Sequence, residues 1–179
     1  MTWEEQLFAL FDDLEQQADA LYDAERGAEL ADRSRSAYAE VTLAGRLMAA
    51  VGADLAVDLR GVGSVTGRLE RAAAGWFLLS TADQDWVVRT DAVLSVLGAP
   101  ARAVPDVAWS PVARLGLGSA LRRLAEAAEP CLVHGLDGRQ DSGILRRVGQ
   151  DFVELATGPD GSRVALVPFA GLAAVQSRR

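Results

Sequence analysis

The sequence predicts an α+β fold, mainly β, in which an N-terminal amphipathic helix precedes two tandem five-stranded small barrels, each with a short helix before it. Three observations predict this fold: helical spacing of apolar residues at the N-terminus, short alternating stretches bounded by glycine, and an internal repeat. We therefore expect an acidic helix over 1–35, a first unit over 36–98, a proline-rich linker over 99–111 and a second unit over 112–179.

The N-terminal segment has the pattern of an amphipathic helix over residues 2–26. Its large apolar residues recur at helical spacing, and Thr2 followed by Glu5 fits a capping box. Such a stripe needs a surface that covers it, because an isolated helix of this length is marginal in water. The surface is either the protein's own body, a partner, or a second copy of the helix. The candidate partner-binding residues here are Trp3, Leu7 and Leu14.

The internal repeat relates the two units. A shift of 76 residues places Leu69 on Leu145 and Trp76 on Phe152 without a gap. Further along the chain the shift becomes 79, because the second copy has three extra residues in a Gly-Pro-Asp-Gly turn. We expect these paired positions to occupy equivalent strands and to be buried.

Alternation and glycine breakers give the elements of each unit. Single glycines inside short strands favour a strongly bent sheet. The expected helices cover 44–51 and 119–128, and the strands of the first unit cover 55–59, 65–71, 76–80, 86–89 and 93–96.

A short helix followed by five bent strands resembles the Sm-like fold, one of the SH3-like small barrels. The similar segments are 143–155 and 165–175, and the resemblance covers about 46–97 and 119–176. It implies either RNA binding or an interaction module. The RNA-binding version carries an Asp and an Asn where this chain has Ala73 and Phe77, and Gly149 and Val153. The chain is therefore more similar to Sm-like interaction modules, including those of actinobacteria.

Charge and composition restrict the partners. The net charge of −7 comes from residues 1–32, which hold ten acids and one arginine, whereas the rest of the chain is close to neutral. A near-neutral body lacks the basic surface that nucleic-acid binding demands. Lysine and asparagine are absent, which indicates a high-GC genome such as that of an actinobacterium. The candidate nucleic-acid-binding residues are Arg68, Arg71, Arg146 and Arg147.

The sequence offers no set of residues for catalysis, and we expect no metal and no cofactor. His134 is the only histidine, and its place on a strand predicts a solvent-facing side chain. Cys131, the only cysteine, is expected to be a small core residue. In the linker, Trp109 either anchors the chain to a barrel or is an exposed binding residue.

These observations predict a non-enzymatic interaction module, an adaptor or regulator that binds a protein through barrel edges or through the acidic helix. The alternative is a nucleic-acid-binding regulator in which the acidic helix masks the strand arginines. No stretch is apolar enough to span a membrane, and the N-terminus is acidic. We therefore expect a cytoplasmic protein without a membrane partner, and a homodimer remains an open alternative.

Overall fold

The computed structural model describes residues 26, 35–36, 38–158 and 161–177. The chain divides into a unit over 1–41 and a unit over 42–179. Residues 2–25 of the helix expected over 2–26, which include its candidate residues Trp3, Leu7 and Leu14, lie outside the described residues.

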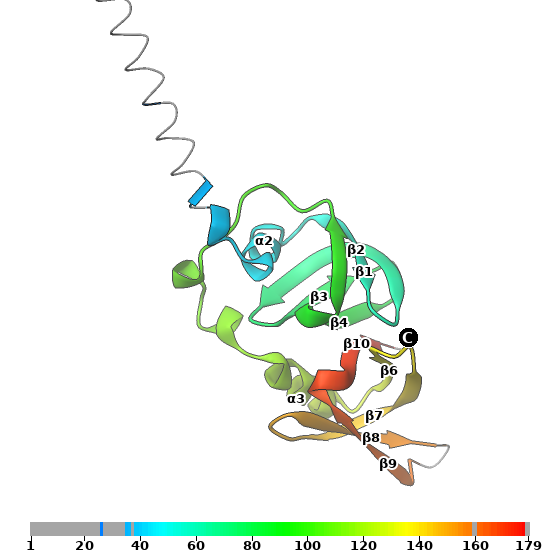
Figure 1. Cartoon of the computed structure of the whole chain (residues 1–179). Coiled ribbons are helices and arrows are strands. Elements are labelled where there is room, and N and C mark those ends of the chain that lie inside the picture. The colour runs from blue at the N-terminus through cyan, green and yellow to red at the C-terminus, as the bar shows by residue number, and fades with distance from the viewer. Residues whose placement is uncertain (1–25, 27–34, 37, 159–160, 178–179) are drawn as a thin grey trace, which may run out of the picture. The chain divides into compact units, whose positions relative to one another are not determined.

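The described part of the second unit contains ten strands, and Figure 1 shows how they follow one another. The first half of the sheet contains β1 (Asp54–Leu59), β2 (Gly63–Ala73), β3 (Trp76–Ser80), β4 (Asp85–Arg89) and β5 (Val93–Leu97). The second half contains β6 (Pro130–Gly135), β7 (Gln140–Val148), β8 (Phe152–Thr157), β9 (Arg163–Pro168) and β10 (Leu172–Ser177).

One short helix precedes each half. The Oγ1 atom of Thr42 accepts a hydrogen bond from Gly45 N and caps α2 (Leu43–Ala49). The second helix, α3 (Leu117–Ala127), ends at Ala128, which adopts the left-handed conformation. Four 3₁₀ turns complete the described elements: η1 (Thr90–Ala92), η2 (Asp106–Ala108), η3 (Val112–Arg114) and η4 (Phe169–Gly171).

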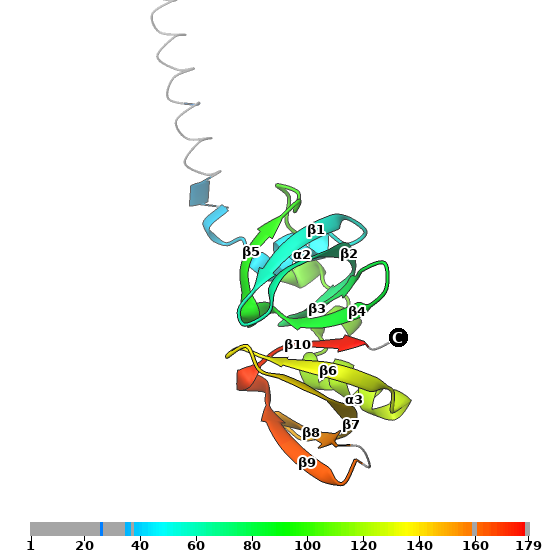
Figure 2. The same cartoon turned by 90° about the vertical axis from the view of Figure 1, so that its right-hand side faces the viewer.

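The prediction of two closed Sm-like or SH3-like small barrels is wrong. The strands form one ten-stranded antiparallel sheet in the order β5-β1-β2-β3-β4-β10-β6-β7-β8-β9. A closed barrel would need β4 to pair with β5. Instead β4 pairs with β10, so Val88 lies opposite Ala174 and Val87 opposite Val175. Figure 2 shows β4 and β10 side by side where the two halves meet.

The two halves use the same strand order and the same register. Val57 in β1 lies opposite Val96 in β5, just as Val133 in β6 lies opposite Val175 in β10. Leu69 lies opposite Leu79, and Leu145 lies opposite Leu155. Positions in one half can therefore be matched with positions in the other half from the hydrogen-bonded registers.

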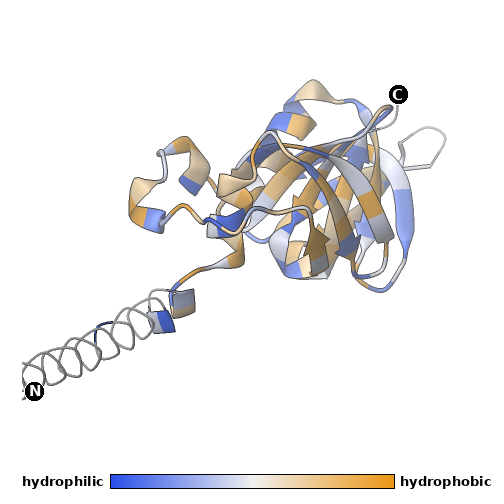
Figure 3. Cartoon of the chain, turned by 90° about the horizontal axis from the view of Figure 1, so that it is seen from above, coloured by the Kyte–Doolittle hydropathy of each residue, from blue (hydrophilic) through white to orange (hydrophobic). Residues whose placement is uncertain are grey.

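Each half has its own hydrophobic core, and the cores meet at the junction. In β1 buried residues alternate with more exposed ones, so one face of this strand turns inward. Figure 3 shows hydrophilic and hydrophobic residues interspersed along the strands. Leu69 and Phe77 are buried in the first core, and Leu145 and Leu155 in the second. Ala174 of β10 belongs to the first core although its strand lies in the second half. The junction is therefore part of the packed interior.

Candidate functional site

The sheet has two open edges, β5 and β9, each paired with a single neighbour in the described part of the chain. An open edge presents backbone N–H and C=O groups that another strand can use. These two edges are the candidate functional site.

The edge strand β5 carries exposed apolar side chains. Leu94 is 61% exposed and Leu97 is 67% exposed, whereas Val93 and Val96 are half-buried against the first core. Its sequence, Val-Leu-Ser-Val-Leu, contains neither a charge nor a proline. Ser95 Oγ donates a hydrogen bond of 2.6 Å to Asp58 Oδ2 and ties β5 to β1. This edge lacks the charged residues and prolines that usually protect edge strands.

The other edge strand, β9, shows the same pattern. Val164 is 58% exposed and Leu166 is 64% exposed, while Ala165 and Val167 pack against the second core. The only charged residue of β9 is Arg163 at its beginning, and its proline is Pro168 at its end. The middle of this edge is therefore apolar and unprotected.

Sequence reasoning did not identify these edge leucines as site residues. The available signal was that β5 and β9 are apolar on both faces, since Val93 is followed by Leu94, and Val164 to Val167 is an unbroken apolar run. A strand of this kind is typical of positions covered on both sides. In this structure one face of each strand is instead exposed to solvent, as Leu97 and Leu166 show.

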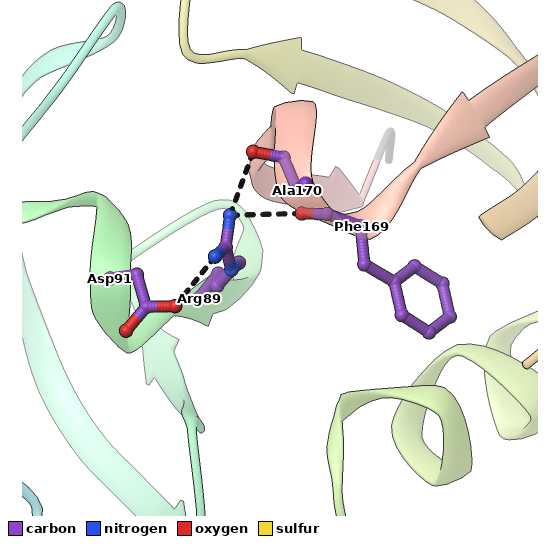
Figure 4. A network of polar contacts seen from close by, with 4 residues as sticks. All are labelled: Arg89, Asp91, Phe169 and Ala170. Atoms are coloured by element: carbon purple, nitrogen blue, oxygen red, sulfur yellow. Dashed lines mark hydrogen bonds and ion pairs between the residues drawn. The ribbon is translucent and has the colours of Figure 1, made fainter. Parts of the chain in front are cut away.

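The junction between β4 and β10 shows what a covered edge looks like in this fold. Arg89, at the end of β4, donates from Nη1 to the backbone oxygens of Phe169 at 3.0 Å and Ala170 at 2.9 Å. Its Nη2 forms an ion pair with Asp91 at 2.5 Å (Figure 4). The guanidinium therefore holds η4 of the second half against the first half.

Further polar contacts cross the junction. The backbone N of Asp85 donates to Ser177 Oγ at 2.8 Å, and Trp76 Nε1 donates to Leu115 O at 2.8 Å. Because these bonds link residues far apart in sequence, they tie the two halves together.

The sequence predicted that His134 faces solvent, and this prediction is wrong. His134 is only 2% exposed. Its ring lies 4.9 Å from the ring of Trp86, and its Nε2 is 2.8 Å from Gln176 Oε1. Gln176 in turn bonds to Gln84. In a separate barrel the side chain of His134 on β6 would face solvent. The pairing of β10 with β4 instead places the ring of Trp86 against the ring of His134.

Cys131 is a buried core residue, as the sequence predicted. Burial raises the pKa of its thiol, an effect partly opposed by a hydrogen bond with the backbone of Leu145. A thiol with a raised pKa is a weak nucleophile at neutral pH. It lines a largely apolar cavity of about 240 Å³ beside the junction, together with Leu124, Pro130 and other residues of α3, β4 and β10.

The candidate nucleic-acid-binding arginines are exposed, and two of them form ion pairs with acids of this chain. Arg68 Nε lies 3.6 Å from Glu70, and Arg147 bonds Glu154 through two nitrogens at 2.9 and 2.8 Å. Arg71 lies on β2 beside a shallow groove of α2 and η3, whereas Arg146 lies on β7 in the other half of the sheet. The four arginines are therefore divided between the two halves.

Trp109 is half-buried in the linker, and its Nε1 donates to Val104 O at 3.0 Å. This bond closes a loop around η2, in which Val107 is 88% exposed. The indole therefore helps to fold the linker itself.

Among the residues that the structure describes, no group of three or more His, Cys, Asp or Glu side chains could hold a metal ion. No helix in that part of the chain is long and apolar enough to cross a lipid bilayer. Comparison with protein-family models and with curated proteins finds no match to this chain.

Proposed function

We propose that this chain is a non-enzymatic interaction module, an adaptor or regulator, that binds a protein by adding a strand to the open edges of its sheet. The observation that carries the proposal is the combination of unpaired backbone with exposed apolar side chains, at Leu94 and Leu97 on β5 and at Val164 and Leu166 on β9. In strand addition the backbone groups supply affinity and the flanking side chains supply specificity.

The alternative, a nucleic-acid-binding regulator, has weaker support from the structure. Phosphate binding needs cations that gather on one surface. Arg68 and Arg147 already neutralise acids of this chain, and they lie in different halves of the sheet. The acidic charge of residues 1–32 would further oppose a phosphate backbone.

The test is capture of a partner from a lysate of the source organism, with the tagged full chain as bait. The matched variants are Leu97→Lys and Leu166→Lys at the edges, and Val107→Lys in the linker as control. We expect a protein that the wild type and the control retain after nuclease treatment and at high salt, and that is lost by the variant whose lysine lies on the edge that the protein binds. Capture that disappears with nuclease or falls steeply with salt would favour nucleic acid instead.

The helix that the sequence predicts over residues 2–26 is the second candidate surface for the same function, and a deletion of residues 1–26 separates it from the edges. If the edges alone bind, the shortened chain retains the partner; if the helix binds, it loses the partner while the sheet stays folded. The lone cysteine, Cys131, which is buried and free, supports a cytoplasmic site of action.

A further inference from the structure

The junction inside the chain is a template for a second junction of the same kind. It pairs the fourth strand of the first half, β4, with the fifth strand of the second half, β10. Within the part of the chain that the structure describes, the two strands left without an outer partner are the fifth strand of the first half, β5, and the fourth strand of the second half, β9. The open edges are thus the missing counterparts of the paired ones.

The registers give the corresponding positions. Val96 occupies in β5 the place of Val175 in β10, because each lies opposite a core valine of the first strand of its half. Leu166 occupies in β9 the place of Val87 in β4, because Leu166 lies opposite Glu154 as Val87 lies opposite Leu78.

We infer that β5 of one copy of this chain pairs with β9 of a second copy, antiparallel and with Val96 opposite Leu166. The inference rests on the proposed strand addition and names the partner as the chain itself. It follows because Val175 lies opposite Val87 in the junction within the chain.

Burial at matched positions supports a missing strand. Val87 is 7% exposed, because β10 lies beside it and α3 packs on its cluster with Trp76. Leu166, at the matched place, is larger and 64% exposed. Leu97 of β5 is likewise 67% exposed, although it matches the half-buried Gln176 of β10. Pairing two copies would cover both leucines and remove apolar area from water.

The helices match in the same way. Leu117, the first residue of α3, packs against the cluster that contains Val87. Leu43, the first residue of α2, is 42% exposed. A second copy that offers β9 to β5 would bring its Leu166 to the side of the sheet on which α2 presents Leu43.

One difference sets the strength of the contact between copies. Arg89 clamps η4 across the internal junction, but the matched residue at the end of β9 is Pro168, because Pro168 lies opposite Phe152 as Arg89 lies opposite Trp76. The second junction therefore lacks the clamp and must also overcome the loss of freedom on association. The association is reversible, and its extent rises with concentration.

The contact is head to tail, since it uses different surfaces on the two copies. Leu97→Lys blocks β5 and leaves β9 open, whereas Leu166→Lys blocks β9 and leaves β5 open. Both positions are exposed, so the folded chain tolerates the charge. We expect each variant alone to be monomeric and their equimolar mixture to form a one-to-one dimer that grows no further.

The experiment measures mass by light scattering and sedimentation over a concentration series of the full chain. Wild type and Val107→Lys should form assemblies that grow with concentration, and Pro168→Arg should form them at lower concentration because it restores a clamp. Single edge variants that still associate would overturn the inference, as would a mixture that stays monomeric. If the wild type is monomeric but captures a lysate protein through its edges, this inference fails while the proposed function stands.

Discussion

At the scale of single residues, the cores depend on leucines at matched places in the two halves. Leu69 is fully buried and Leu145 is 1% exposed, each at the centre of the second strand of its half. The strand opposite places another buried leucine, Leu79 or Leu155, beside each of them.

Replacing Leu145 with alanine should lower the free energy of unfolding by about 2–5 kcal/mol, because it removes buried methyl groups and leaves a cavity. Chemical denaturation followed by circular dichroism measures the change. The control is Val107→Ala, whose side chain is 88% exposed and whose loss should leave stability within about 0.5 kcal/mol of the wild type. Equal stability of Leu145→Ala and wild type would contradict its place in the core.

At the scale of elements, the turns after β1 and β6 approach each other closely. A Cβ atom on Gly61 would lie 2.4 Å from the backbone oxygen of Gly135 and 2.8 Å from the nitrogen of Gly138. Gly61 also has a φ of +75°. Glycine is needed here both for the backbone conformation and for the approach of the two halves.

The pair Gly61→Ala and Gly63→Ala separates these two requirements. Gly63 has a φ of +99°, but a Cβ atom there would meet nothing within 4 Å. Both variants carry the strain of a left-handed alanine, about 1–2 kcal/mol, while only Gly61→Ala pushes the halves apart. We expect a clearly larger loss of melting temperature for Gly61→Ala, and equal losses would show that the approach of the turns is not restrictive.

The bond between β1 and β5 gives a pH dependence. Hydrogen bonds from Ser95 and then Ser64 hold the pKa of Asp58 below its ordinary value. Since the folded pKa is lowered, this stabilisation is present above the pKa of the unfolded chain and is lost as pH falls through the folded pKa. Ser95→Ala should therefore raise the pKa of Asp58 in an NMR titration, and Ser64→Ala should raise it less. An unshifted carboxyl in Ser95→Ala would show that the hydroxyl does not bind it.

Elements were predictable from the sequence where side chains alternate, and their pairing was not. The expected strand 76–80 has the bounds of β3, and the strand expected over 65–71 extends to 63–73 because its outer residues also find partners on β1 and β3. Alternation tells which face of a strand is buried but carries no information about its edges. That is why the pairing of β4 with β10, and with it the burial of His134, was missed.

At the scale of the whole molecule, the described sheet behaves as one packed body because its halves share core residues. Ala174 is fully buried in the first core, yet β10 is held by β6 of the second half. Loss of structure in either half would therefore uncover apolar surface in the other.

Ala174→Leu should destabilise both halves together, because overpacking of a closed core costs about 1–3 kcal/mol. In a chain with Trp3 and Trp109 replaced by phenylalanine, tryptophan fluorescence reports the first half and the junction through Trp76 and Trp86. Hydrogen exchange of the β8 amides reports the second half. We expect one transition shared by both signals at a lowered temperature. Protection of β8 that survives the fluorescence change would mean that the halves unfold separately.

The order in which a ribosome makes the strands gives the pairing of β4 with β10 a further meaning. All five strands of the first half leave the ribosome before β6 begins. In contrast, β10, which pairs with the outer edge of β4, is the last of the ten strands to appear. During that interval the nascent chain exposes β4 as a third open edge, and contacts of such long sequence separation form slowly. Until β10 arrives, β5 of a finished copy, which matches β10, can pair with the same valines of β4 that β10 will cover, so newly made chains are open to wrong pairing throughout the synthesis of β6 to β9.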